Sequence, residues 1–245
     1  MHIGTQPFGP LDILVRPPVL IPRPETEDWT LKLAKTFEPM SARKPIRLLD
    51  LCTGTGCIPL LLCHLWPQGV VHALGVDIAA EAIQLAQDNA KHCGISLASD
   101  ELHLQEGLDR NLNTFSVQKG DILQPRFHQQ LRWQPVDILT SNPPYIPAHE
   151  YASLPASVKD YEDKRALLGD LERSPSDGRG LTFYRAIAEL VRSDGFIKPG
   201  GLIALEVGHG QSEEVQNLMM TQAGVRGSEI WRDPWGIPRT VISWK

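Results

Sequence analysis

The sequence predicts an α/β fold, a doubly wound and mostly parallel sheet of seven strands with a C-terminal antiparallel hairpin, preceded by a short β-hairpin. Short apolar runs alternate with helix-like stripes from residue 46 onward, the order that favours parallel strands joined by right-handed crossovers. A glycine turn joins the first of these runs to its helix. Two further β-type runs, at 228–233 and 238–244, end the chain and predict the closing hairpin.

The N-terminal elements come first along the chain. Residues 12–21 hold two short β-type runs around Pro17 and Pro18, and we expect them to form the opening hairpin or a bent edge ribbon. A helix is expected from Glu25, because acidic residues in a first turn meet the positive end of the helix dipole. Pro39 bounds the end of that helix.

The elements of the main sheet follow. Its first five strands are expected at 46–51, 70–78, 113–118, 135–141 and 201–208. Helices are expected at 57–66, 79–94, 180–194 and 211–222. Residues 146–180 are polar and rich in turn residues, and a loop of that length in a compact domain predicts a functional lid or a partner-binding segment.

Charge and cysteine content exclude several classes of protein. The chain carries 24 basic and 29 acidic residues, a formal net charge of −5, so no overall positive field draws it to nucleic acid. Its four cysteines lack C-x-x-C spacing and its histidines lack metal-ligand spacing, so we expect free thiols and no metal site. No apolar run approaches the roughly 20 residues of a membrane-spanning helix, so no membrane partner is expected.

The glycine turn at residues 50–56, DLCTGTG, predicts a ligand site, because bare backbone between a strand and a helix lets a ligand come close. Asp77 closes the next strand, 21 residues after Gly56, where a carboxylate can accept hydrogen bonds from both hydroxyls of a ribose. Together the two motifs predict a site for a nucleoside-containing cofactor. A tight turn followed by a helix N-cap is the alternative interpretation.

Two residues distinguish between candidate cofactors. Pro59 replaces the third glycine of the G-x-G-x-x-G pattern that is typical of NAD sites. Asp50 precedes the glycines, where an acid would sit badly beside a pyrophosphate but can attract an ammonium group. S-adenosylmethionine carries an ammonium group and a ribose and has no phosphate, so it fits the pattern better than NAD.

The strand at 135–141 runs directly into Asn142-Pro143-Pro144-Tyr145. The two prolines fix φ near −65° and hold the preceding residues extended, so the Asn142 side chain and the neighbouring carbonyls form a rigid set of acceptors. Such a set suits an NH2 group, and Tyr145 offers a flat face to a planar amide or base. A proline turn that merely ends a strand is the alternative interpretation.

These motifs resemble the class I, S-adenosylmethionine-dependent methyltransferases that act on planar nitrogens. More narrowly, the chain resembles the peptide-chain release factor glutamine methyltransferases from about residue 4 to its end. The resemblance rests on these motifs together with LIPRPETE (20–27), RAL (165–167), LEVGHGQ (205–211) and Asp233-x-x-Gly236-x-x-Arg239. The IPRPETE element is the most discriminating, because DNA adenine methyltransferases share N-P-P-Y but are not expected to carry it.

The resemblance implies a Rossmann-like fold, a cofactor and roles for individual residues. The cofactor is S-adenosyl-L-methionine, and the reaction is N5-methylation of the glutamine in the Gly-Gly-Gln motif of class 1 release factors. The substrate residues are Asn142, Pro143, Pro144 and Tyr145, of which Asn142, Pro143 and Tyr145 are catalytic. The cofactor residues are Cys52, Thr53, Gly54, Thr55, Gly56, Asp77, Asp121, Ile122 and Asn142, with Asp121 and Ile122 beside the adenine.

The resemblance also bears on domains, assembly and location. Residues 1–24 are expected to be a β-hairpin and proline-rich loop, the remnant of a linker to a missing helical domain, and residues 25–245 the methyltransferase domain. Gly169-Asp170 and the residues after it depart from the family's usual glycine pair, so the loop there is expected to differ in shape. We expect a monomer without a targeting segment, in the cytoplasm of a bacterium or the mitochondrial matrix of a eukaryote.

Three alternatives stay open on the sequence alone. The methylated glutamine could belong to a ribosomal protein, since motif spacing does not separate the two substrates. The exocyclic amine of adenine fits the same acceptors, although the net charge of −5 and the lack of room for a target-recognition domain disfavour nucleic acid. A third alternative, a catalytically idle scaffold subunit, is disfavoured by the intact Asp50, Asp77 and N-P-P-Y.

Overall fold

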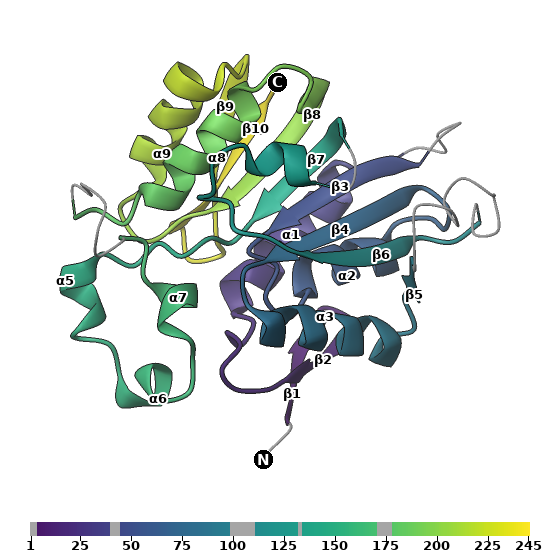
Figure 1. Cartoon of the computed structure of the whole chain (residues 1–245), viewed down its shortest axis with the longest axis horizontal. Helices are drawn as coiled ribbons and strands as arrows, with labels where there is room; N and C mark the ends of the chain where they lie inside the picture. Colours follow the sequence, from purple (N-terminus) through teal and green to yellow (C-terminus); the bar gives the residue numbers. More distant parts are fainter. Residues whose placement is uncertain (1–3, 40–44, 99–110, 132–133, 171–177) are drawn as a thin grey trace.

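The computed structural model describes residues 4–39, 45–98, 111–131, 134–170 and 178–245 (Figure 1). At its centre is a sheet with the strand order β5-β6-β4-β3-β7-β8-β10-β9. In chain order its strands are β3 (Ile46–Leu51), β4 (Val71–Asp77), β5 (Ser96–Leu97), β6 (Thr114–Lys119), β7 (Val136–Ser141), β8 (Ile197–Glu206), β9 (Gly227–Arg232) and β10 (Pro238–Trp244).

The sheet is parallel from β5 to β8 and antiparallel where β10 pairs with β8 and β9. The chain moves outward from β3 in one direction and then returns to β3's other side at β7, which is the reversal of strand order that defines a doubly wound fold. The α/β prediction is thereby confirmed. The count of seven strands is corrected to eight in the described part of the chain, because β5 has only two residues and leaves no periodic pattern in the sequence.

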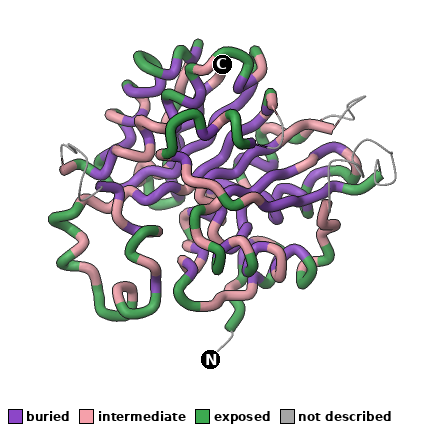
Figure 2. Tube along the Cα trace, viewed as in Figure 1, coloured by how far each residue is buried: buried purple, intermediate pink, exposed green. Residues whose placement is uncertain are grey.

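Helices cover both faces of the sheet. One face carries α1 (Pro24–Thr36), α2 (Cys57–Leu65) and α3 (Ala80–His92), and the other carries α8 (Thr182–Arg192) and α9 (Ser212–Leu218). Successive strand residues point to opposite faces, so that Leu48 joins the first core and Leu49 the second. Figure 2 shows the consequence, a set of central strands that is buried along most of its length.

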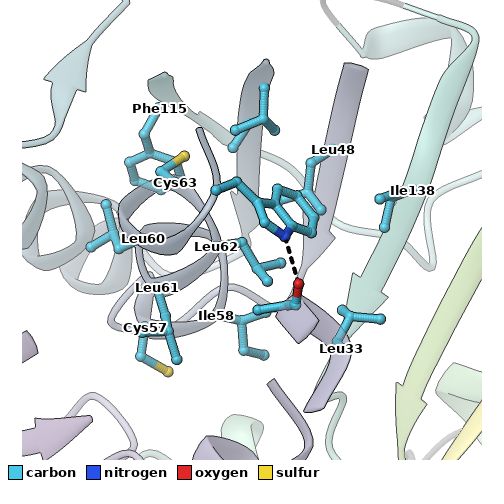
Figure 3. Packing of buried hydrophobic residues seen from close by; sticks show 14 of the residues in the cluster. Leu33, Leu48, Cys57, Ile58, Leu60, Leu61, Leu62, Cys63, Phe115 and Ile138 are labelled. Atoms are coloured by element: carbon cyan, nitrogen blue, oxygen red, sulfur yellow. Dashed lines mark hydrogen bonds between the residues drawn. The ribbon is translucent and has the colours of Figure 1, made fainter. Parts of the chain in front are cut away.

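The first core is densest around α2. Its residues from Ile58 to Cys63 are buried and pack against Leu48 of β3, Phe115 of β6 and Leu33 of α1 (Figure 3). The helix is buried from Cys57 to Cys63, and a helix buried on all sides needs an apolar sequence, which CIPLLLC supplies before the exposed His64 and Leu65. Because α2 is anchored in this core, the glycine turn directly before it is held in place.

The opening hairpin lies earlier in the chain than the sequence predicted. It pairs β1 (Gly4–Phe8) with β2 (Leu11–Val15), whereas residues 12–21 were expected to form it. The turn falls at Gly9, whose φ of +59° suits a hairpin reversal. Pro17 and Pro18 were assigned to the middle of the ribbon, but prolines donate no ladder hydrogen bond, so the strand ends before them.

The hairpin is bound to the rest of the fold through Asn89 of α3. Its Oδ1 accepts from the amide of Leu14 at 2.7 Å, and its Nδ2 donates to the carbonyls of Leu14 and Thr55. Phe8 and Ile13 meanwhile join the first hydrophobic core. One asparagine thus ties β2 to the glycine turn.

We call residues 146–170 the flap. It contains three short helices, α5 (Ala148–Tyr151), α6 (Ala156–Lys159) and α7 (Lys164–Leu167), and projects from the body of the molecule (Figure 1). Its ends are joined, because the Ile146 amide donates to the Leu167 carbonyl and the Gly169 amide donates to the Ile146 carbonyl, both at 2.9 Å. The later part of the predicted loop, residues 171–177, lies outside the described residues.

The remaining elements lie close to their predicted places. The helix expected at 211–222 is α9 followed by a π-helical turn, η2 (Met219–Ala223), which ends at Gly224 with a φ of +65°. A 3-10 turn, η1 (Phe127–Gln130), precedes β7.

Candidate cofactor and substrate site

A cavity of about 580 Å³ opens at the carboxyl ends of β3, β4, β6 and β7. Its walls also include the loop before α1, the N-terminus of α3 and the α7 part of the flap. Ligands of open α/β sheets bind at this edge, where the strand order reverses, and the volume lies in the range of small-molecule sites.

Asp77 lies at the end of β4 in the cavity wall. Its Oδ2 accepts from the Gly54 amide and its Oδ1 from the Ala79 amide, both at 2.9 Å. Burial raises the pKa of Asp77, and the backbone hydrogen bonds oppose that rise. Each carboxylate oxygen retains acceptor capacity, so the side chain can position the glycine turn and receive ligand hydroxyls together.

Two residues of the glycine turn, Cys52 and Gly54, line the cavity, each with a left-handed φ. Thr53 and Thr55 are buried beneath it, with 4% and 2% of their surfaces exposed. Gly56 also has a left-handed φ, +78°, and in addition a Cβ there would lie 3.2 Å from the Cβ of Ala86 in α3. Part of the glycine pattern therefore permits helix packing rather than ligand approach.

Asp121 and Ile122 follow β6 and both line the cavity. The Asp121 carboxylate accepts from the Leu123 amide at 2.9 Å and holds the loop in shape, while Ile122 is 93% buried and offers an apolar wall. An acceptor beside an apolar surface is the arrangement that the sequence analysis expected for an adenine.

Asp50 occupies a different place. It is completely buried, its Oδ1 accepts from Thr140 at 2.7 Å, and it does not line the cavity. Its Oδ2 and the hydroxyl oxygen of Thr53 have no hydrogen-bond partner, and burial raises the pKa of Asp50 to about 7. Asp50 could therefore attract a bound ammonium group only through the cavity wall, without contacting it.

The N-P-P-Y segment follows β7 along the same edge. Asn142 and Pro144 line the cavity, whereas Pro143 is buried and Tyr145 is half-buried. Burial raises the pKa of the Tyr145 phenol well above its usual range, so the ring is neutral. The carbonyl of Tyr145 accepts from Gln211 Nε2 at 2.9 Å, which joins the LEVGHGQ segment to this loop.

Glycines enclose Tyr145. A Cβ on Gly180 would lie 2.1 Å from the Tyr145 carbonyl oxygen, and one on Gly208 would lie 2.9 Å from the Tyr145 ring. A Cβ on Gly169, at the end of the flap, would lie 2.8 Å from the carbonyl carbon of Tyr145. These glycines explain why the segments around 169, 180 and 208 can converge on one tyrosine.

Sequence reasoning missed two contributors to the site. Thr26 of α1 accepts a hydrogen bond from Asn142 Nδ2 at 3.2 Å, and Arg165 of the flap lines the cavity near Asp77. Both belong to motifs that carried the family resemblance, IPRPETE and RAL. No spacing within either motif indicated which side chain faces the cavity.

Neither a metal site nor a membrane span is visible in the described ranges. Among those residues, no group of three or more His, Cys, Asp or Glu side chains could hold a metal ion. No helix there is both long and apolar enough to cross a bilayer.

Proteins similar to this chain bear on its family. No family model matches the chain. It is 33% identical over 241 residues to the release factor glutamine methyltransferase of Bacillus cereus, covering 98% of this chain and 74% of the relative. It is 33% identical over 239 residues to the enzyme of the same name from Geobacter sulfurreducens, covering 98% and 70%.

Solved structures agree on the fold. A methyltransferase from Pyrococcus furiosus superimposes with a TM-score of 0.57 at 17% identity, covering 96% of this chain and 89% of that one. A human methyltransferase 10 domain containing protein gives 0.56 at 15% identity, covering 96% and 88%. Fold, motifs and near full-length similarity converge, and the chain belongs to the family of release factor glutamine methyltransferases.

Proposed function

We propose that this protein transfers a methyl group from S-adenosylmethionine to the side-chain nitrogen of the glutamine in the Gly-Gly-Gln motif of class 1 release factors. The observation that carries the proposal is the Asn142 amide at the wall of the cofactor-sized cavity, with its Nδ2 bonded to Thr26. A fixed amide at that point presents an acceptor oxygen to a substrate NH2 group. The names of the curated relatives support the same substrate class.

The residues present fit the proposed cofactor. Asp77 supplies a carboxylate for ribose hydroxyls, and Asp121 with Ile122 supplies an acceptor beside an apolar wall for adenine. The cavity has a volume of about 580 Å³, and Cys52 and Gly54, both with left-handed φ, line it. When bound, S-adenosylmethionine supplies an electrophilic methyl group. We propose that Thr53, Thr55 and Gly56 belong to the cofactor site by holding the glycine turn in shape behind the cavity wall.

The protein's own task is to place and polarise a weak nucleophile. A carboxamide nitrogen shares its lone pair with the carbonyl, and no side chain at pH 7 removes its proton in the ground state. In the proposal, Asn142 Oδ1 and the Pro143 carbonyl accept the two N–H groups of the substrate glutamine and raise electron density on its nitrogen. Tyr145 stacks on the amide plane, and Pro144 keeps the loop rigid.

These contacts accelerate methyl transfer in two ways, by placing the nitrogen and by stabilising its charge. Acceptors held by a rigid loop bring the nitrogen to within about 3–3.5 Å of the reacting carbon without further ordering. Positive charge develops on the nitrogen as its bond to the methyl carbon forms and the carbon–sulfur bond breaks. The same two carbonyl oxygens stabilise that charge, and one N–H proton then passes to solvent, which leaves the neutral N-methyl amide. In the proposal the neutral Tyr145 ring covers one face of the substrate amide.

Transfer of labelled methyl groups tests the substrate. The purified protein is incubated with labelled S-adenosylmethionine and a release factor, with a Gln→Ala variant in the Gly-Gly-Gln motif as the control. We expect label on the wild-type factor alone. Equal or greater label on ribosomal proteins or on adenine in DNA or RNA would assign one of those substrates instead.

The Asn142→Ala variant tests the site. We expect methyl transfer to fall by at least about 100-fold, while the dissociation constant for the cofactor, measured by calorimetry, changes by less than about fivefold. Turnover retained in this variant would remove Asn142 from the proposed mechanism. We also propose that the enzyme is a monomer, which light scattering during size-exclusion chromatography measures.

A further inference from the structure

Three side chains, the half-buried Asn142 and the buried Thr26 and Glu206, link the cavity wall to the interior of the protein. Asn142 Nδ2 donates to Thr26 Oγ1 at 3.2 Å, and Thr26 Oγ1 donates to Glu206 Oε2 at 2.7 Å. Thr26 and Glu206 each expose 2% of their surface. The link crosses three elements, the loop after β7, helix α1 and the end of β8.

The direction of each hydrogen bond follows from the chemistry of its ends. The indole N–H of Trp29 is only a donor, and it lies 2.8 Å from the same Glu206 Oε2, which is therefore an acceptor. The single hydroxyl hydrogen of Thr26 points to that oxygen. The Thr26 oxygen then has only lone pairs left, so it accepts, and only the NH2 side of the Asn142 amide can face it.

Orientation matters because an asparagine amide is nearly symmetric in shape. Turned by 180°, Asn142 would present NH2 instead of oxygen to the substrate NH2, and two donors do not bond. The carboxylate at the far end also polarises the chain, since successive hydrogen bonds strengthen one another in a poorly screened interior. Donation from Nδ2 makes Oδ1 a better acceptor.

Removing a carboxylate from water costs free energy, so a buried Glu206 lowers the stability of the folded protein unless its hydrogen bonds offset that cost. Burial raises the pKa of Glu206, as does the nearby charge of Glu25, while Arg239 and the donors Thr26 and Trp29 oppose the rise. An apolar residue would fill the same volume at lower cost. The position of this buried carboxylate at the end of the link indicates a role in the site.

We propose that Glu206 and Thr26 are positioning residues that fix the Asn142 amide with Nδ2 inward and Oδ1 toward the substrate. The inference rests on the proposed function, in which Oδ1 accepts from the substrate amide. Neither positioning residue touches the substrate or the cofactor.

Thr26→Val is the central variant, because it keeps the shape of the side chain and removes the hydroxyl. We expect turnover to fall about 100-fold while the cofactor dissociation constant stays within about twofold. Thr26→Ser, which restores the hydroxyl, should return turnover to within about fivefold of wild type. The fall should appear in kcat rather than in KM, because the transition state needs the oriented acceptor most.

Thr30→Val is the matched control. Thr30 lies one turn along the same helix, is fully buried, and its hydroxyl donates to the Thr26 carbonyl at 2.6 Å rather than to Glu206 or Asn142. We expect turnover close to wild type. A loss in Thr30→Val equal to that in Thr26→Val, or failure of Thr26→Ser to recover activity, would assign the hydroxyl a purely structural role and overturn the proposal.

Two variants test Glu206. In Glu206→Gln the amide oxygen can take the place of Oε2 and accept from Trp29 and Thr26, so we expect turnover within about tenfold of wild type. In Glu206→Leu the Thr26 hydroxyl loses its acceptor and is free to donate to Asn142, and we expect a loss of about 100-fold. Equal activity in the two variants would overturn the role of Glu206.

A readout independent of activity separates this inference from the proposed function. The side-chain NH2 signals of Asn142, identified by their absence in Asn142→Ala, are followed by NMR in the cofactor-free protein. We expect slow exchange with solvent in wild type and Thr26→Ser, and fast exchange in Thr26→Val. Fast exchange in wild type refutes the link even if the release factor is methylated, and slow exchange supports it even if another substrate is found.

Discussion

The guanidinium of Arg23 lies 2.6 Å from both carboxylate oxygens of Glu162 and joins the loop before α1 to the flap. Glu162 is 94% buried, and the next residue, Asp163, donates its amide to the Pro18 carbonyl at 2.8 Å. These contacts attach the flap to the segment before α1, in addition to the hydrogen bonds that join its two ends. Arg23 belongs to IPRPETE, so this motif contributes an arginine to closure as well as a threonine to the Asn142 link.

Arg23→Gln should loosen the flap. Glu162 would keep a buried carboxylate without its charged partner. Because the Arg23 side chain is 35% exposed, the loss should be smaller than the roughly 3–5 kcal/mol of a fully buried pair. Since the flap forms a wall of the cavity, we expect cofactor to dissociate at least about tenfold faster, measured by stopped-flow displacement. Arg16→Gln breaks another pair on the same N-terminal segment, with Asp88 of α3, and should leave the rate unchanged.

Asp77→Asn should weaken cofactor binding about 10- to 100-fold, because hydrogen bonds to a charged acceptor contribute about 1.5–3 kcal/mol each. Because asparagine has one acceptor oxygen instead of two, either the Gly54 amide or the Ala79 amide would also lose its hydrogen-bond acceptor. Calorimetry measures the affinity. Asp137→Asn is the matched control, since Asp137 also accepts from a backbone amide, that of Arg47, but lies at the opposite end of the strands. Equal losses in both variants would show a general effect on the sheet.

Gly180→Ala should displace Tyr145 and reduce methyl transfer strongly, because the new Cβ would lie 2.1 Å from the Tyr145 carbonyl oxygen. Gly178→Ala separates this clash from backbone strain. Gly178 has nearly the same φ, +71° against +72°, yet its Cβ would meet nothing within 4 Å. Both variants should lose about 1–2 kcal/mol of stability from the left-handed backbone. Only Gly180→Ala should also lose turnover, and thermal unfolding with a methyl-transfer assay measures both effects.

The buried carboxyl of Asp50 should make stability depend on pH. Burial raises its pKa from the ordinary value of 3.8 to about 7 in the folded protein, so between these values the folded chain binds the extra proton. The Asp50 contribution therefore falls as pH rises from about 4 to 7 and is then constant. In Asp50→Asn this contribution is absent, so the free energy of unfolding relative to wild type should rise by roughly 2–4 kcal/mol from pH 4 to pH 8. Urea unfolding at both values measures it, and a difference that does not change with pH would contradict the assignment.

The sheet was predictable because its strands carry apolar residues for both faces. Leu48 and Leu49 enter different cores, and the run that contains them could only be a strand covered on both sides. The cavity was predictable for a similar reason, since Asp77 and Asn142 each end a parallel strand and such ends meet at one edge. Local pattern and chain direction were sufficient for these parts.

Other parts depend on contacts that no local pattern encodes. Thr26 and Glu206 are 180 positions apart, and nothing in either segment specifies how helix α1 is set against β8. The opening hairpin was misplaced because the β-type residues after Val15 look like a strand, although Pro17 and Pro18 cannot donate to one. Gly56 packs against Ala86, in a helix that only the tertiary fold brings near, so no local pattern indicated this contact.

Asn89 connects the N-terminal hairpin to the glycine turn, which limits where the chain can be altered. Because the same side chain bonds to Leu14 and to the Thr55 carbonyl, the glycine turn is braced by a segment that precedes the first long helix. The stretch between Val15 and Pro24 looks in sequence like a good place for a tag, a fusion joint or a cut. A cut or deletion there would separate the hairpin, and with it the Leu14 contact to Asn89, from the rest of the chain. Shortened versions of the protein should therefore retain Gly4 to Val15.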